Sequence, residues 1–410
     1  MNEHVQTATS EPLFNPLSPE FIRNPYPHYA RMRTTDPVHL TPLGVFVASR
    51  HAEASLVMRD KRFGKDYVER TIRRYGPDIM KEPVFASMSH WMLQQDPPDH
   101  TRLRGLVVKA FTARRVEDMR PRVQQIVDET LDRIIPLGKM DLIEDFAFRL
   151  PVTIICDMLG IPEEHRETFY AGSRDGGRLL DPVPLSPAEI QQGNAGNALA
   201  AMYFQQLFEL RRKNPGDDLI TQLVQAEEEG SKLSNEELTA NIILLFGAGH
   251  ETTVNLIGNG LLALHRNPDQ LALLKARPEL ITNAIEEFLR YDSSVQLTGR
   301  VALEDIDDLG GRRIPKGESV LCLLGSANHD PAVYPDHPER LDIERPNVRP
   351  LSFGGGIHFC LGAQLARIEA DIAISTLLRR LPDLRLDDAV NPEWRPTFVL
   401  RGLKRLPASW

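Results

Sequence analysis

Apolar residues return every three or four positions along much of the chain, which is the spacing of helices that bury one face. The pattern dominates from about residue 99 to 290 and is clearest over 116–135, 142–159 and 199–213. We predict a helix over each of these segments.

Two further helices carry additional signals. Ser234 begins the sequence Ser-Asn-Glu-Glu, which is typical of a capped helix start, and the apolar run at 239–249 follows it. Residues 361–380, directly after Cys360, also have the periodicity of a long amphipathic helix.

Strand patterns are few and short, at 38–40, 44–48 and 318–323, with Pro and Gly at their edges. The five prolines of 331–350 predict an irregular meander. Internal repeats and low-complexity tracts are absent from the sequence. We therefore predict a mainly α fold with a minor β-sheet region, in one domain over 1–410. Its β-rich portions are expected near 38–50, 294–323 and 384–410.

The composition is that of a soluble globular protein, with 41% hydrophobic and 26% charged residues. A net charge of −9 argues against nucleic acid as the main partner, because phosphate binding needs a dominant basic surface. Residues 1–16 lack the apolar core of a signal peptide, and the apolar run at 242–249 is too short to span a bilayer. We expect a cytoplasmic protein without a membrane segment.

The three cysteines, at 156, 322 and 360, are too sparse for a disulfide framework or a zinc site. Cys360 ends the run Phe-Gly-Gly-Gly-Ile-His-Phe-Cys, whose glycines allow a tight turn and a close approach to a flat partner. Near a helix start its pKa is expected to fall, which would give a thiolate able to bind one metal. The alternative is a buried structural cysteine.

A second unusual stretch is Ala248-Gly-His-Glu-Thr-Thr, inside the predicted central helix. The acid of Glu251 beside the hydroxyl of Thr252 could relay protons into a dry cavity. The alternative is a helix that turns both side chains to solvent. Glu287 and Arg290, three residues apart, can form an ion pair on one helix face, and we interpret that pair as structural.

The cysteine loop resembles the haem-binding signature of bacterial cytochromes P450 at every fixed position, from Phe353 to Gly362. The resemblance extends from Asn24 to Pro407. It implies a single-domain cytochrome P450 fold that encloses haem b, with Cys360 as the axial thiolate on the iron. It also gives Thr252 the role of protecting bound dioxygen and Glu251 that of proton delivery.

The same resemblance assigns structural and cofactor-binding partners. It implies that Glu287 and Arg290 are joined by an arginine of the meander, which we expect to be Arg340. The two haem carboxylates need cationic partners. The residues at the matching positions are His100, Arg104, Arg300 and His358. Arg102 is excluded because it should point to another helix face.

The implied function is that of a haem-thiolate monooxygenase, which inserts one oxygen atom of O₂ into a hydrophobic small molecule. The chain has no flavin or NAD fingerprint and hence no fused reductase, so a separate ferredoxin and an NAD(P)H-dependent reductase are expected to supply electrons to a monomeric enzyme. Residues 100–122 hold seven basic residues against two acids, which could steer an acidic ferredoxin.

Three other functions fit parts of the pattern. One is a peroxide-driven haem-thiolate enzyme, although such relatives usually lack an acid–alcohol pair like Glu251 and Thr252. A second is a haem-containing ligand binder without catalysis. A third is a helical protein that has no cofactor and uses Cys360 structurally.

The substrate pocket is expected to be apolar. By order along the chain it should include the 168–195 segment, of which 175–193 is predicted to be a mobile lid. The other expected lining residues are Val84, Phe85, Met88, Trp91, Ile243, Phe246, Gly247, Val295, Leu297 and Phe398.

Overall fold

The computed structural model describes residues 12–167, 173–225 and 233–410, and everything below refers to these. Residues 1–11, which include most of the segment considered for a signal peptide, and 168–172 of the expected pocket lie outside them. The described α-helices are α1 (Pro19–Arg23), α2 (Tyr26–Thr35), α3 (His51–Arg59), α4 (Tyr67–Tyr75), α5 (Pro83–Ser89), α6 (Asp99–Ala110), α7 (Ala113–Asp118), α8 (Arg120–Ile134), α9 (Arg149–Leu159), α11 (Pro187–Lys213), α12 (Leu219–Gln225), α13 (Asn235–Arg266), α14 (Pro268–Ala276), α15 (Ile281–Tyr291), α16 (Leu324–Ala327) and α17 (Ala363–Arg380).

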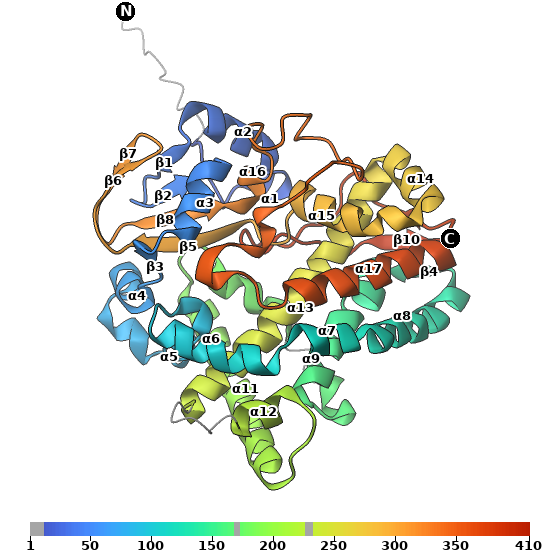
Figure 1. Cartoon of the computed structure of the whole chain (residues 1–410), viewed down its shortest axis with the longest axis horizontal. Helices are drawn as coiled ribbons and strands as arrows, with labels where there is room; N and C mark the ends of the chain where they lie inside the picture. Colours follow the sequence, from blue (N-terminus) through green and yellow to red (C-terminus); the bar gives the residue numbers. More distant parts are fainter. Residues whose placement is uncertain (1–11, 168–172, 226–232) are drawn as a thin grey trace, which may run out of the picture.

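The strands form one larger sheet and two small ones beside the helices (Figure 1). The larger sheet has the order β1-β2-β8-β5-β3, in which β2 and β8 are parallel and the other neighbours antiparallel. In the other two sheets β10 pairs with both β4 and β9, and β6 pairs with β7. The strands are β1 (Val38–Leu40), β2 (Phe46–Ala48), β3 (Phe63–Gly64), β4 (Lys139–Asp141), β5 (Leu297–Ala302), β6 (Ile306–Leu309), β7 (Arg312–Ile314), β8 (Ser319–Leu323), β9 (Arg385–Leu386) and β10 (Pro407–Ser409).

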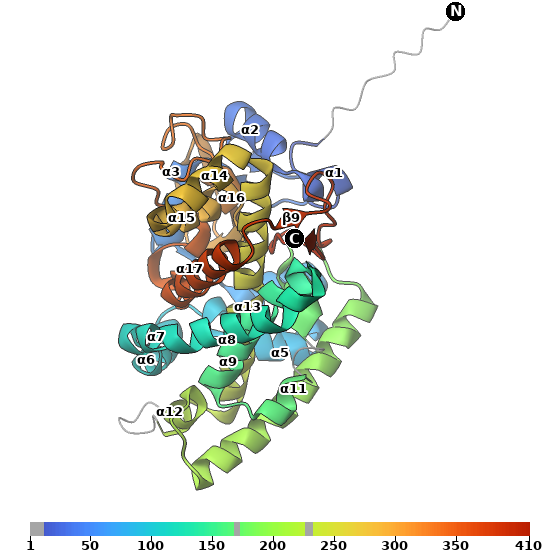
Figure 2. The ribbon, with the colours of Figure 1, turned by 90° about the vertical axis from the view of Figure 1, so that its right-hand side faces the viewer.

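The central element is α13, a helix of 32 residues that runs through the middle of the molecule (Figures 1 and 2). Ser234 and Glu237 form the capping box expected from the sequence, so the helix begins where the pattern predicted. α13 packs against α9, α11 and α17, and from Leu238 to Leu264 most of its residues are buried. It therefore forms a rigid wall in the middle of the molecule, next to α17.

Two segments that we predicted to be single helices are interrupted in the structure. The segment 116–135 is divided at Met119, because Pro121 fits the first turn of α8 but would break a continuous helix. Within 142–159, Leu142–Ala147 forms a π-helical turn, closed by the bond from Phe148 N to Ile143 O, before α9 begins.

The helix predicted over 199–213 begins earlier than expected. α11 starts at Pro187, where Ser186 and Glu189 form a capping box. The stretch 187–198 has little apolar periodicity, so sequence pattern alone did not reveal it. Helices α1 to α5, before residue 99, were also not predicted.

Three groups of buried apolar side chains hold the described part of the protein together. The largest lies among the helices around α13, and the second lies between the large sheet and α3. The third joins α1 and α2 to the large sheet and to residues 398–400. Among the described helices, none combines the length and the apolar content that crossing a bilayer would require.

Candidate functional site

The cysteine loop is held against α3 by its glycines. Gly356 has a φ of +66°, and a Cβ at this position would collide with the carbonyl oxygen of Met58. The amide of Cys360 donates to the carbonyl of Phe353 at 2.9 Å, which closes the loop just before α17. This geometry explains why the run before Cys360 needs glycine.

The side chain of Cys360 borders a cavity, where a ligand can reach it, so it is not a structural cysteine packed in the core; the surrounding protein nevertheless removes the sulfur from bulk water. The predicted fall in the pKa of Cys360 is wrong for a thiol that has no metal bound to it. Removal from bulk water raises the pKa, and the amide of Gly362 and the charges of Arg104 and Arg367 offset this only in part. A bound metal cation would reverse the balance, because a coordinated thiol loses its proton.

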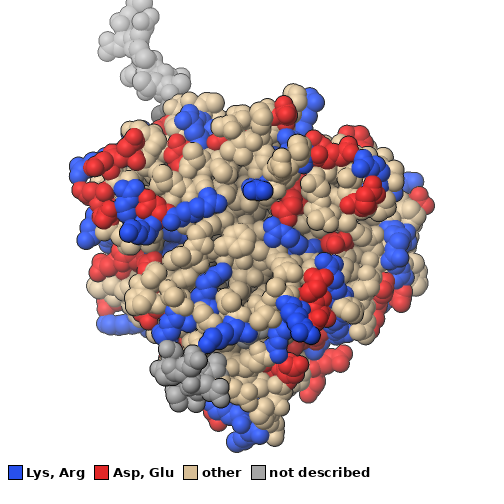
Figure 3. All heavy atoms as spheres, viewed as in Figure 1, with Lys and Arg blue, Asp and Glu red and all other residues tan. Residues whose placement is uncertain are grey.

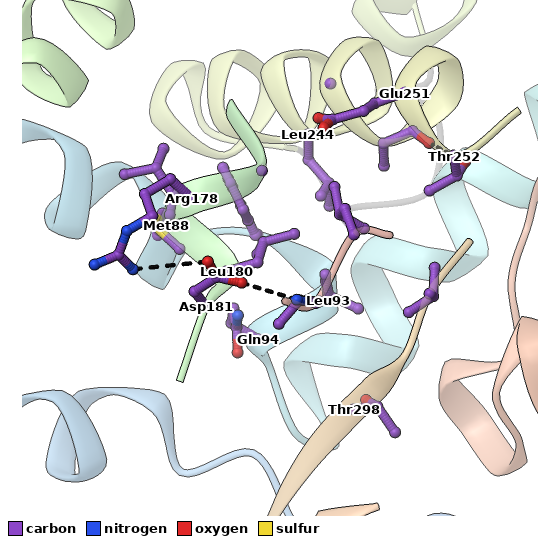
Figure 4. A pocket seen from close by; sticks show the side chains of 18 of the residues that line it. Met88, Leu93, Gln94, Arg178, Leu180, Asp181, Leu244, Glu251, Thr252 and Thr298 are labelled. Carbon is purple, nitrogen blue, oxygen red and sulfur yellow. Dashed lines mark hydrogen bonds and ion pairs between the residues drawn. The ribbon is translucent and has the colours of Figure 1, made fainter. Parts of the chain in front are cut away.

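The cavity next to Cys360 has a volume of about 2250 Å³ and extends from the cysteine loop to α13 and beyond. Figure 4 shows side chains of its wall, contributed by α5, α13, β5 and the segment before α11. Its walls are mainly apolar, and Met88 and Leu244 are among the side chains labelled there. The space is large enough for a prosthetic group together with a substrate.

Glu251 and Thr252 both border this cavity on α13, so neither is simply turned to the outer surface (Figure 4). The Thr252 hydroxyl donates to the carbonyl of Ala248 at 3.0 Å, one turn earlier in the same helix. Glu251 is 8% exposed, and a Cβ at Gly177 would lie 2.9 Å from its carboxylate oxygen. The backbone of the segment at Gly177 therefore covers Glu251.

Two histidines face each other at the loop. The ring centres of His100 and His358 are 4.3 Å apart. Both ring nitrogens of His100 and Nε2 of His358 nevertheless lack a hydrogen-bond partner among the described residues. Burial, and then the neighbouring cations, lower the pKa of both rings. Buried nitrogens without partners point to a ligand that would supply them.

Cations are concentrated at the same place. Arg300 and Lys65 are both buried, and their side chains donate to neutral acceptors on β5, Thr298 and Gly299. The backbone amide of Lys65 binds the carboxylate of Asp96, but neither side-chain cation has a carboxylate within 4 Å in the described part of the chain. Burial lowers the pKa of each. Arg104 lies beside them in the cavity wall and donates to the carbonyl of Phe359 at 2.6 Å.

These residues fit haem b. A flat molecule with two carboxylates would compensate the buried cations and accept from the histidine nitrogens, while its metal faced the sulfur of Cys360. Lys65 was missed by sequence reasoning, because a lysine beside a short strand gives no sign that it is buried.

The predicted structural network is present, but its third member is Arg345. Nε of Arg345 lies 3.3 Å from Glu287, which also binds Arg290 at 2.7 Å. The side chain of Arg340 is 71% exposed, and this residue contributes only its carbonyl oxygen. The prediction of Arg340 is therefore wrong, because the register of an irregular meander cannot be read from spacing.

Most expected pocket residues do line the cavity, with one correction. Phe398 packs instead against Phe14 and Phe21, and its neighbours Val399 and Leu400 face the cavity. The indole N–H of Trp91, at the cavity wall, has no acceptor among the described residues. The segment proposed as a lid contains a 3₁₀ helix (Ser173–Leu180) and the first turns of α11, and part of it borders the cavity.

Comparisons with known proteins agree with this site. The family model described as Cytochrome P450 matches residues 191–277 and 275–392. Cytochrome P450 monooxygenase PikC of Streptomyces venezuelae is 43% identical over 98% of this chain and 96% of that protein. Vitamin D(3) 25-hydroxylase of Pseudonocardia autotrophica is 41% identical over 98% of both chains. The crystal structure of CalO2 superposes with a TM-score of 0.89 at 36% identity, covering 97% of this chain and 98% of that one.

Proposed function

The chain belongs to the cytochrome P450 family of haem-thiolate monooxygenases, and we propose that it inserts one oxygen atom of O₂ into a hydrophobic small molecule with electrons from a ferredoxin. The fold is the mainly helical, single-domain fold of that family. The observation that carries the proposal is that Cys360 borders the same mainly apolar cavity as Glu251 and Thr252 of α13.

We assign the cofactor contacts as follows. Cys360 binds the iron, and His100, Arg104, Arg300 and His358 hold the carboxylates, with Lys65 as an additional partner. The buried cations and unpartnered ring nitrogens support this assignment. When bound, haem with a thiolate ligand supplies the oxidising chemistry that no amino acid side chain can provide.

Thr252 and Glu251 are proposed to control protons at the α13 wall of the cavity. The Thr252 hydroxyl, now bonded to Ala248, can rotate to donate into the cavity, and the adjacent carboxylate can replenish its proton. Glu251 is suited to this role because it is buried at the cavity rather than solvated. The same pair argues against the peroxide-driven alternative, which needs no proton delivery of this kind.

Thr252→Ala is expected to keep haem and substrate binding but to divert most of the consumed NAD(P)H into hydrogen peroxide or water. The change removes the hydroxyl without altering the helix, because alanine is a good helix former. Product formed per NAD(P)H should fall by about 10²-fold, the usual contribution of one proton donor. Thr253→Ala, one position along α13, is the control and should retain coupling. Full product yield in Thr252→Ala would contradict the proposed role.

The substrate is proposed to be hydrophobic because the cavity wall is mainly apolar. One relative is named a vitamin D(3) hydroxylase, which fits a pocket of this character. Burial of apolar surface would supply most of the affinity, at roughly 25 cal/mol per Å².

The proposed ferredoxin would dock over the cysteine loop. Three exposed apolar residues lie there: Ile357 and Phe359, next to Cys360 in the loop, and Val108 on α6. Figure 3 shows basic side chains around an uncharged area on this face. The excess charge of 100–122 is smaller than the sequence suggested, because acids from elsewhere pair with Arg102, Arg115 and Arg122.

The function is tested with purified holoenzyme, a [2Fe–2S] ferredoxin, its reductase, NADPH and ¹⁸O₂. One ¹⁸O atom should appear in the product.

The docking of the ferredoxin is tested with Arg114→Glu, on α7 beside α17. This change should raise the half-saturating ferredoxin concentration by about three- to tenfold. Arg313→Glu, also an exposed arginine but on the distant β7 hairpin, should not. Equal rates with hydrogen peroxide alone would favour the peroxide-driven enzyme, and consumption of no NADPH would favour the binder.

A further inference from the structure

Two arginines on α4 border the same cavity away from the cysteine loop. Arg70 and Arg74 are four residues apart, so both project from one face of the helix. Nη2 of Arg70 donates to Oε1 of Gln94 at 3.2 Å, and Nη2 of Arg74 donates to the carbonyl of Pro182. Both acceptors are neutral.

Neither arginine of this pair forms an ion pair within the described residues, because no carboxylate lies within 4 Å of either guanidinium. Asp66 acts on Arg70, and Asp181 on Arg74, only from farther away. The guanidinium groups also lie over the rings of Tyr67 and Tyr75. Burial lowers the pKa of both arginines, and the positive charge of Arg74 adds to this effect at Arg70. Arg70 is half-buried and Arg74 is exposed, and two neighbouring cations at a cavity wall repel each other unless an anion joins them.

The acids nearby are already engaged. Arg178, another arginine of the cavity wall, lies 2.8 Å from Glu189 and 3.8 Å from Asp181. Asp181 also accepts from the amides of Phe398 and Val399 at 3.1 and 2.8 Å. Arg178 therefore has its counter-charges, and Figure 4 shows it beside Asp181. Arg70 and Arg74, by contrast, have no carboxylate within 4 Å among the described residues.

Arg70 is close enough to Arg300 and Lys65 for their charges to act on one another, but it lies on another side of β5 than the Arg300 side chain. Consecutive side chains of a strand point to opposite faces, so Arg300 and a side chain at Gly299 would leave β5 on different sides. A Cβ at Gly299 would lie 3.5 Å from Nη1 of Arg70. Arg70 thus lies against the face of β5 opposite to the Arg300 side chain. Gln94, which binds Arg70, projects into the cavity near Leu93 and Asp181 (Figure 4).

We propose that Arg70 and Arg74 form an anion subsite, and that the substrates include amphipathic acids whose carboxylate binds there. The guanidinium groups present parallel N–H donors to a carboxylate, which is the strong form of this contact. The apolar chain would extend along Met88 and Leu244 towards Thr252. This inference rests on the proposed function, since it places the substrate in the same cavity.

The test compares dodecanoic acid with 1-dodecanol, which shares the chain but lacks the charge, in holoenzyme titrations read by the haem absorption shift and by calorimetry. The wild type should bind the acid more tightly. Arg70→Gln with Arg74→Gln should weaken binding of the acid by about tenfold or more and that of the alcohol by less than about twofold. Arg73→Gln is the matched control, because Arg73 is on the same helix and borders the same cavity but lies 3.9 Å from the carboxylate of Asp66.

The outcomes separate this inference from the function on which it rests. Equal weakening of acid and alcohol, no preference of the wild type for the acid, or binding of neither compound would overturn the subsite. Loss of haem from the double variant would also overturn it, since the arginines would then serve the haem carboxylates. A wild-type protein that takes up no haem would instead refute the proposed function.

Discussion

Cys360→Ser is expected to abolish the thiolate-type absorption band of the reduced carbon monoxide complex and to lower turnover by at least about 10²-fold. A serine hydroxyl is far weaker as an acid than a thiol, so it cannot supply the anionic ligand that a coordinated cysteine supplies. The carboxylate partners remain in place, with Arg300 and Lys65 buried beside His100 and His358. The variant should therefore still take up haem, which separates ligand loss from loss of the cofactor.

The other two cysteines provide the controls for this experiment. Cys156 lies in α9 and Cys322 in β8, and both are fully buried in apolar surroundings. Burial raises the pKa of each to about 12, so neither is available as an anion at neutral pH. Cys156→Ala should keep both the absorption band and activity. A Cys360→Ser protein with an unchanged spectrum would show that another group binds the iron.

The parts of the site that sequence predicts are those set by local backbone. The glycines before Cys360 and the capping box at Ser234 each impose a conformation on their own segment. These local conformations can therefore be predicted without knowing how the rest of the chain packs around them. The direction of the Cys360 pKa is different, because it depends on burial, and burial is decided by segments far away in sequence.

The parts that sequence misses are pairings across long distances. Lys65 is buried against β5, more than two hundred residues later in the chain, and nothing near it announces this. Phe398 and Val399 are adjacent and similar in character, yet only Val399 faces the cavity. Arg340 and Arg345 are both arginines of one meander, and only the folded backbone decides which side chain turns inward. Residue type alone could not settle these choices.

The buried network around Glu287 predicts a large loss of stability when this carboxylate is removed. The Glu287 side chain is fully buried, and its carboxylate receives Arg290 at 2.7 Å, Arg345 at 3.3 Å and the amide of Asp342 at 2.9 Å. Arg290 in turn donates to the carbonyls of Pro338 and Arg340, at 2.6 and 2.8 Å. One carboxylate thus fixes two arginines that hold the meander leading to the cysteine loop.

Glu287→Gln is expected to lower the free energy of unfolding by about 3–5 kcal/mol, because two buried guanidinium groups lose their counter-charge. For a chain of this length that corresponds to a fall of roughly 3–6 °C in the midpoint of thermal unfolding. Since the meander precedes the haem loop, the variant should also release haem faster. Both effects can be measured on holoenzyme, by calorimetry and by transfer of haem to excess apomyoglobin.

Two variants test whether the network is the cause. Glu286→Gln breaks the neighbouring pair with Arg367, which is partly exposed, so its cost should stay below about 1 kcal/mol. Arg340→Gln leaves the carbonyl that Arg290 uses and removes only an exposed side chain, so it should be nearly neutral, whereas Arg345→Gln should resemble Glu287→Gln. Wild-type stability in Glu287→Gln, or a larger loss in Arg340→Gln than in Arg345→Gln, would show that the meander is held by other contacts.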